Sequence, residues 1–132
     1  MEDCIFCKIV ENKSPCWKVY EDDSYLAFLP LEPHARGHIL VIPKKHYRWV
    51  WDVDDTSGYF KISKKIANAL RKVYNPFFVM GLQHGDGVSH AHIHLIPRFK
   101  DDGHGSVLNP NLKLSLSDKE KKEIVDKIKE VL

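Results

Sequence analysis

The chain has 132 residues, of which 43% are hydrophobic and 29% are charged, and its formal net charge is +2. A charge this small gives no reason to expect a nucleic acid or a membrane surface as partner, and no stretch approaches the ~20 apolar residues of a membrane-spanning helix. With no apolar signal peptide and with three cysteines, too few for a disulfide framework, we expect a cytoplasmic protein.

The first third of the chain predicts a short helix followed by three strands. The helix covers 4–10, and the strands cover 17–20, 25–29 and 38–42. Pro15 prevents the helix from continuing because it has no backbone N–H. The acidic turn at 21–24 predicts that the first two strands form a hairpin, and Pro43 closes the third strand.

The remainder predicts a long helix, two strands and a C-terminal helix. Apolar residues recur every three or four positions from Tyr59 to Val73, which is typical of an amphipathic helix of about four turns. Several N-cap candidates precede it over 54–57, and Pro76 follows it. The two strands cover 77–82 and 89–98, with a tight turn at 85–87 between them and a loop at 101–111 after them.

Ser117 and Glu120 form a capping box that opens the last helix. Helices together with apparently antiparallel strands predict an α+β domain, and the length predicts a single domain over 1–132.

The most informative stretch is the strand predicted at 89–98, in which His90, His92 and His94 alternate with apolar residues. Successive side chains of a strand point to opposite faces, so we expect the three imidazoles to project from one face. Imidazole ionises near neutral pH and serves as base, nucleophile or metal ligand. The alternative is an amphipathic strand whose solvent-exposed face happens to carry histidine, but three histidines in strict alternation favour a chemical role.

This stretch, followed by Pro97-Arg98, resembles the signature of the histidine-triad (HIT) family of nucleotide-binding hydrolases and transferases. Residues 37–46, with the sequence GHILVIPKKH, and residues 4–10, with the sequence CIFCKIV, agree with it in the family's order. The diagnostic motifs lie within 4–98, and 99–132 add a loop and a helix. The resemblance implies a five-stranded antiparallel sheet with one long helix packed on it, short N-terminal and C-terminal helices, a homodimer and a purine nucleotide as ligand.

The resemblance also assigns roles to the histidines. It makes His92 the nucleophile and places His94 and His38 as donors around the transition state. The implied reaction is cleavage of a nucleoside phosphoramidate or a (di)nucleoside polyphosphate through a covalent nucleotidyl-histidine. Gln83 and His94 would contact the phosphate. The positions that sandwich the base, whose alternative interpretation is plain core packing, are Ile5, Phe6, Ile9, Phe28 and Leu31.

Two departures from the family pattern favour a second hypothesis. The loop before the triad is shorter than in the family and carries Asp86, whose charge repels phosphate. Pro30 replaces an aspartate that holds the ribose hydroxyls, and proline offers no side-chain acceptor. Both departures fit a nucleotide-binding module of the same fold that is catalytically weak or inactive.

Cys4 and Cys7 have the spacing of half a zinc site. The resemblance to zinc-bearing relatives supplies His46 and His90 as the other two ligands of a closed, structural zinc site. A third hypothesis, a catalytic metal shared by the three alternating histidines, is disfavoured because about 13 Å separates the Cα atoms of the first and third along a strand.

Overall fold

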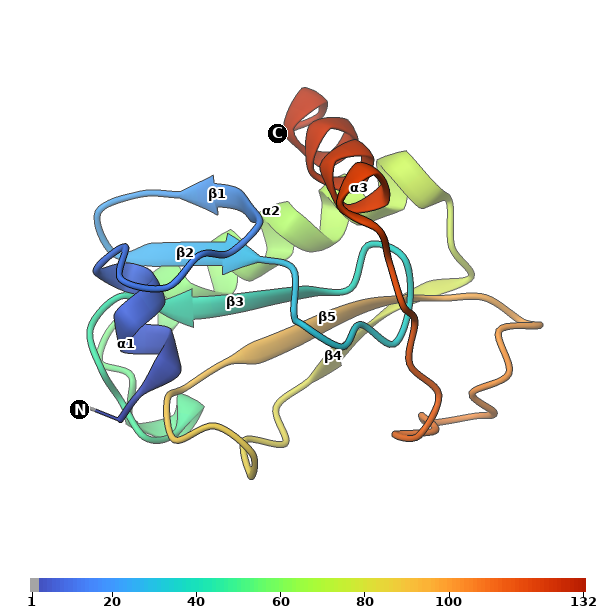
Figure 1. Ribbon diagram of the computed structural model, residues 1–132. Coiled ribbons are helices and arrows are strands. Elements are labelled where there is room, and N and C mark those ends of the chain that lie inside the picture. The colour runs from blue at the N-terminus through green and yellow to red at the C-terminus, as the bar shows by residue number, and fades with distance from the viewer. Residues whose placement is uncertain (1–2) are drawn as a thin grey trace.

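Five strands form one antiparallel sheet in the order β1-β2-β3-β5-β4 in the computed structural model, which describes residues 3–132 (Figure 1). The strands are β1 (Lys18–Glu21), β2 (Tyr25–Phe28), β3 (Ile39–Pro43), β4 (Phe78–Leu82) and β5 (Ile93–Arg98). The helices are α1 (Ile5–Val10), α2 (Thr56–Tyr74) and α3 (Asp118–Glu130), with a 3-10 turn η1 (Val50–Asp52). The α+β prediction is confirmed, including the long helix and the short helices near both ends.

The long helix α2 begins and ends where local side chains allow it. Asp55 is its N-cap and accepts a hydrogen bond from the Gly58 N–H at 3.0 Å, a contact that typically stabilises a helix by about 1 kcal/mol. Asn75 adopts the left-handed conformation at the C-cap, directly before Pro76. The buried Tyr59 hydroxyl donates to the carbonyl of Val41 at 2.7 Å and so fastens the helix to the middle of the sheet.

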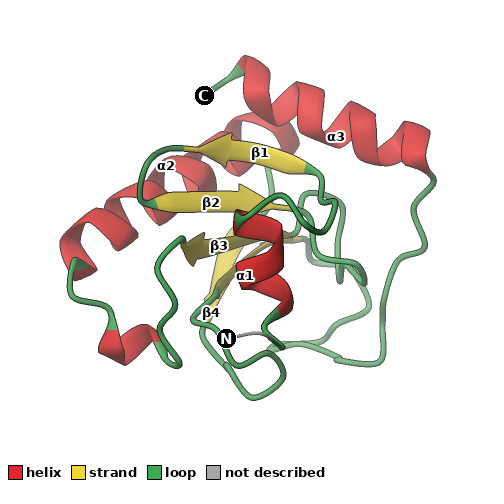
Figure 2. Cartoon of the chain, turned by 60° about the vertical axis from the view of Figure 1, so that its left-hand side comes forward, coloured by secondary structure: helices red, strands yellow, loops and turns green. Residues whose placement is uncertain are grey.

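The sheet separates two apolar clusters because its side chains alternate between faces. The cluster on the α2 side includes Ala91, Ile93 and Leu95. The cluster on the other side joins Phe6 and neighbouring α1 residues to β2 and β3. Figure 2 shows α1 in front of the sheet and α2 behind it, with α3 lying across the top near β1.

The capping box of α3 is present as predicted, with the Ser117 side chain accepting from the Glu120 N–H. The apolar residues Ile124 and Ile128 of α3 are buried in the cluster on the α2 side. Within the described part of the chain, no helix combines the length and apolar character that crossing a bilayer requires.

The histidine stretch corrects the prediction of one strand over 89–98. β5 begins only at Ile93, so His90 and His92 precede it. The reason is that β3 pairs with β5 no further than Val41 opposite Ile93, which leaves the preceding residues without a neighbouring strand there. The alternation of faces nevertheless continues, since Ala91 lies in the α2-side cluster whereas His90 and His92 contact Phe6 on the α1 side. The alternative of a solvent-exposed histidine face is wrong, because His90 and His92 are 0% and 6% exposed.

Candidate active site and metal site

Four imidazole rings lie side by side on the α1 side of the sheet. Ring centroids are 5.0 Å apart between His92 and His94, and 5.2 Å apart between His94 and His38. His34, from the loop before β3, stacks on His38 at 5.5 Å. The structure therefore brings together His92, His94 and His38 and adds His34, which the sequence analysis did not single out.

Backbone carbonyls determine which ring nitrogen carries the proton in two of these histidines. His92 Nδ1 lies 2.8 Å from the carbonyl oxygen of His90. A carbonyl only accepts, so Nδ1 carries the proton and Nε2 keeps its lone pair. His90 Nε2 lies 2.8 Å from the carbonyl oxygen of Pro43. His90 therefore keeps its lone pair on Nδ1, the nitrogen that faces the two cysteines.

A backbone N–H places the proton of His38 and of His94 on Nε2, whereas His92 carries its proton on Nδ1. The His34 N–H donates to His38 Nδ1 at 2.9 Å, so the proton of neutral His38 is on Nε2. His38 Nε2 lies 2.9 Å from His94 Nδ1 and donates to it. His94 in its neutral form therefore carries its proton on Nε2 and is a hydrogen-bond donor there.

Burial favours the uncharged form of three of these imidazoles, those of His38, His92 and His94. Desolvation is the largest effect on each ring and lowers the pKa of His38, His92 and His94, the last to about 4. Neighbouring histidines lower the pKa of His38 and His94 further, because adjacent positive charges repel. At neutral pH these three rings therefore offer one lone pair, on His92 Nε2, and one N–H donor, on His94 Nε2.

A second layer of contacts holds the loop that carries His34 and His38. The buried His104 donates from Nε2 to the His34 carbonyl at 2.7 Å, and its Nδ1 accepts the Asn109 N–H at 3.1 Å. His34 Nδ1 donates to the Leu112 carbonyl at 2.9 Å. No sequence signal could have identified His104, since it lies between two glycines in a stretch that only predicts a loop.

Arg98 anchors the loop that carries His104. Its guanidinium is 2% exposed, pairs with Asp102 at 2.7 Å and donates to the carbonyls of Gly105 and Val107. Asp102 also accepts the His104 N–H at 3.0 Å. The arginine of the family signature thus has a structural function here, because one buried cation orders the turn that supports the histidine row.

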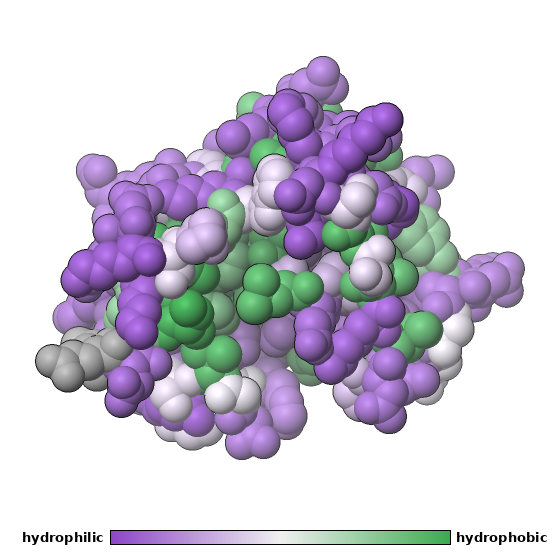
Figure 3. All heavy atoms as spheres, viewed as in Figure 1, coloured by the Kyte–Doolittle hydropathy of each residue, from purple (hydrophilic) through white to green (hydrophobic). Residues whose placement is uncertain are grey.

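The candidate base-binding residues divide into buried and exposed groups. Phe6, Ile9 and Phe28 form part of the α1-side cluster, and the Phe6 ring lies 5.4 Å from the His92 ring, edge to face. Ile5 and Leu31 lie at the surface, 40% and 89% exposed. Apolar side chains also reach the surface on the face seen in Figure 3, where hydrophilic side chains surround them.

Gln83, the candidate phosphate contact, has a buried side-chain oxygen that makes no hydrogen bond within residues 3–132. Pro30 is half-buried and offers no side-chain acceptor. Asp86, in the short loop before the triad, is exposed. The side-chain oxygen of Gln83 therefore has no hydrogen-bond partner among the described residues. Pro30 has no side-chain group that could hold the ribose hydroxyls.

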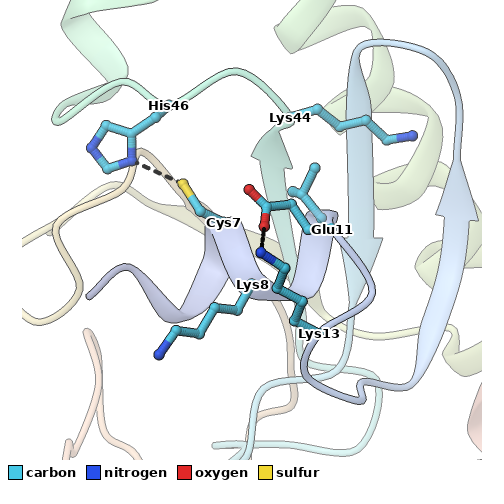
Figure 4. A pocket seen from close by; sticks show the side chains of 7 residues that line it. Cys7, Lys8, Glu11, Lys13, Lys44 and His46 are labelled. Atoms are coloured by element: carbon cyan, nitrogen blue, oxygen red, sulfur yellow. Dashed lines mark hydrogen bonds and ion pairs between the residues drawn. The ribbon is translucent and has the colours of Figure 1, made fainter. Parts of the chain in front are cut away.

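The ligand atoms of Cys4, Cys7, His46 and His90 lie within 4.8 Å of one another, close enough to hold one metal ion. His90 Nδ1 is 3.3 Å from Cys4 Sγ, and His46 Nδ1 is 3.2 Å from Cys7 Sγ. Figure 4 shows Cys7 and His46 facing each other beside a surface hollow that lysines also line. Two thiols and two imidazoles are a donor set that suits zinc in a tetrahedral site.

Burial raises the pKa of the Cys7 thiol to about 11, and a hydrogen bond and charge repulsion from Cys4 add to the effect. A metal ion at these residues would hold the thiolates deprotonated, so its binding releases protons. His90 belongs to both sites, because its ring faces the cysteines while its carbonyl orients His92.

Comparison with known proteins decides the family. A family model described as the HIT domain matches residues 11–101. The chain belongs to the histidine-triad (HIT) family. An uncharacterised HIT-like protein of Borreliella burgdorferi is 46% identical over 114 residues, which cover 80% of this chain and 82% of the relative. The adenosine 5'-monophosphoramidase of Saccharomyces cerevisiae is 36% identical over 108 residues, covering 80% of this chain and 68% of that protein.

Solved structures of HIT proteins share the whole fold. A HIT-like protein from Bartonella henselae, crystallised with an unknown ligand, matches with a TM-score of 0.87 at 34% identity and covers 100% of this chain and 98% of its own. A Zn-bound histidine triad family protein from Mycobacterium smegmatis matches with a TM-score of 0.79 at 26% identity, over 98% of this chain and 95% of its own. The predicted HIT fold is therefore confirmed.

Proposed function

We propose that this HIT protein is a nucleotidyl hydrolase that cleaves a nucleoside phosphoramidate or a (di)nucleoside polyphosphate. Its nucleophile would be His92, with His94 and His38 as the supporting donors. The observation that carries the proposal is the hydrogen bond from His92 Nδ1 to the His90 carbonyl at 2.8 Å, which leaves the Nε2 lone pair free. The similarity to a yeast adenosine 5'-monophosphoramidase supports the phosphoramidate as the first substrate to test.

The chemistry proceeds in two displacements at phosphorus. The His92 Nε2 lone pair bonds to the phosphorus that carries the nucleoside, and the bond from phosphorus to the leaving nitrogen or oxygen breaks. The leaving group departs with that electron pair and takes a proton from solvent, while the His94 Nε2–H group donates a hydrogen bond to the phosphoryl oxygen. Water then attacks the phosphorus and gives one proton to solvent, and the bond to His92 breaks with its electrons returning to Nε2. The product is a nucleoside monophosphate.

The residues proposed to bind the nucleotide are those expected from the sequence. Gln83 and His94 would donate to the phosphate, Gln83 through its side-chain NH2 group and His94 through Nε2. The base would lie against the α1 face. The residues for that contact are Ile5, Phe6, Ile9, Phe28 and Leu31.

We further propose that Cys4, Cys7, His46 and His90 hold a structural zinc ion. The convergence of their ligand atoms and the Zn-bound relative from Mycobacterium smegmatis support this assignment. Zinc there would fix α1 to the start of the triad stretch and take no part in the displacement. A metal shared by His90, His92 and His94 is disfavoured, because His90 Nδ1 faces the cysteines and neutral His94 carries its proton on Nε2.

The test is the intact mass of the protein after brief mixing with an adenosine phosphoramidate, for wild type and His92→Ala. We expect a nucleotidyl adduct on the wild type that is absent from the variant. Native conditions report bound zinc and the oligomeric state in the same spectrum, and we propose a homodimer. An unmodified wild type that still binds nucleotide would instead support the second function, a catalytically inactive binding module, which Pro30 and the short loop favour.

A further inference from the structure

Arg48 lies beside the triad, although no sequence motif singled it out. The segment that contains it runs next to the triad segment, because the Ala91 N–H donates to the Tyr47 carbonyl at 2.7 Å. Two residues before Arg48, the His46 ring lies 4.9 Å from the His90 ring.

The guanidinium is held in place from two sides. Arg48 Nη1 donates to the carbonyl of Gly85 at 2.9 Å, and the guanidinium carbon lies 3.6 Å from the centroid of the Trp49 ring. Gly85 has a φ of 76°, and a Cβ at that position would lie 3.2 Å from the Trp49 ring. Arg48 and Trp49 therefore form a support on which the short loop before the triad is folded.

The charge of Arg48 has no carboxylate partner within residues 3–132. Among residues 3–132, the ion pairs engage other basic side chains and leave Arg48 out. The side chain is half-buried, and a cation that is partly desolvated without a counterion is costly to hold. A guanidinium has five N–H donors, and the Gly85 carbonyl uses one that the structure records.

We propose that Arg48 binds the substrate phosphate and replaces contacts that the shortened loop at 83–89 lacks. The proposal rests on the proposed function, since it concerns the phosphoryl group that His92 attacks. The fork of N–H groups matches two non-bridging phosphate oxygens, and the anion neutralises the unpaired charge. Arg48 then selects ligands that carry a phosphate over the corresponding nucleoside.

The test measures binding of AMP and of adenosine by titration calorimetry to wild type, Arg48→Gln and Arg48→Lys at one salt concentration. We expect Arg48→Gln to weaken AMP binding about tenfold and to leave adenosine binding unchanged, since a charge-assisted contact to phosphate is lost. Arg48→Lys should bind AMP with intermediate affinity, because an ammonium keeps the charge and loses the fork. Equal weakening of AMP and adenosine would overturn the proposal, since it would show that Arg48 only supports the loop.

Arg71→Gln is the matched control, because it removes the same charge from an exposed position on α2. It should bind AMP as the wild type does, and an equal loss in this variant would assign the effect to net charge and overturn the proposal. The same experiments distinguish the failure of the catalytic proposal for His92 from the failure of the phosphate contact proposed for Arg48. A nucleotidyl adduct on wild type together with unchanged AMP affinity in Arg48→Gln would retain the catalytic proposal and reject this one.

Discussion

His38 and His94 are joined by a hydrogen bond of 2.9 Å between Nε2 and Nδ1, and its direction is set by a backbone amide on the far side of His38. Because the His34 N–H occupies His38 Nδ1, the proton of neutral His38 has to lie on Nε2. The pair therefore presents a fixed donor at His94 Nε2. A proton cannot pass along the row to His34 unless that backbone hydrogen bond first breaks.

The first prediction concerns His104, which supports this arrangement from a distance. His104→Phe keeps an aromatic ring and removes the hydrogen bond to the His34 carbonyl, so the loop that orients His38 loses a support. We expect kcat for a phosphoramidate to fall about tenfold with little change in KM, which corresponds to the loss of one hydrogen bond at the transition state.

The matched variant for His104 is His104→Gln, whose amide can still donate to the His34 carbonyl. It should retain most of kcat. Nitrogen-15 NMR of the imidazoles gives an independent readout, since His38 should show a protonated Nε2 in wild type and in His104→Gln. A wild-type kcat and an unchanged His38 spectrum in His104→Phe would contradict the prediction.

The second prediction concerns acid stability. The pKa of His94 falls from its ordinary value of 6.5 to about 4 in the folded protein. Between these two pH values the unfolded chain binds a proton at His94 that the folded chain does not, so acidification favours unfolding. The stabilisation is complete above pH 6.5 and is lost as the pH falls toward 4, with a contribution from His94 on the order of 3 kcal/mol.

The measurement is urea unfolding at several pH values for wild type and His94→Gln. The slope of the unfolding free energy against pH should be smaller in the variant between pH 4 and 6.5. His84→Gln is the comparison, because this exposed histidine lowers the pKa of His94 less than burial does, so the slope should change less than in His94→Gln. An identical slope in wild type and His94→Gln would rule out a perturbed His94.

The third prediction concerns the metal site. The double variant Cys4→Ser, Cys7→Ser should lose its zinc and melt about 10 °C or more below the wild type, because metal binding contributes to folding. Cys16→Ser changes a thiol that lies outside the metal cluster and should keep both the zinc and the melting temperature. Zinc content by elemental analysis and melting by circular dichroism provide the two readouts.

The same double variant separates the structural zinc from a catalytic one. Because the His90 carbonyl orients His92, loss of zinc should also slow formation of the nucleotidyl adduct even where the variant remains folded. One zinc retained per chain in the double variant would instead place the metal on the histidine row.

Local signals in the sequence predicted most of the helices and strands. Hydrophobic periodicity, the capping box at Ser117 and the proline after α2 are local signals, and each lies where the structure places a helix or its end. The alternation of His90, His92 and His94 correctly placed their side chains on one face. The same pattern wrongly predicted that the strand begins before Ile93. A strand also needs a neighbouring strand, and the pairing of β5 with β3 stops at Ile93.

Tertiary structure alone decided the chemistry of the histidine row. The proton positions of His90 and His38 depend on Pro43 and His34, and the support of His34 depends on His104, which lies 70 residues away. The approach of Arg48 to the triad likewise depends on a contact between segments far apart in the chain. Hydrogen bonds of this kind leave no periodic pattern in the sequence. They are determined by which backbone groups the folded chain brings within about 3 Å of a side chain.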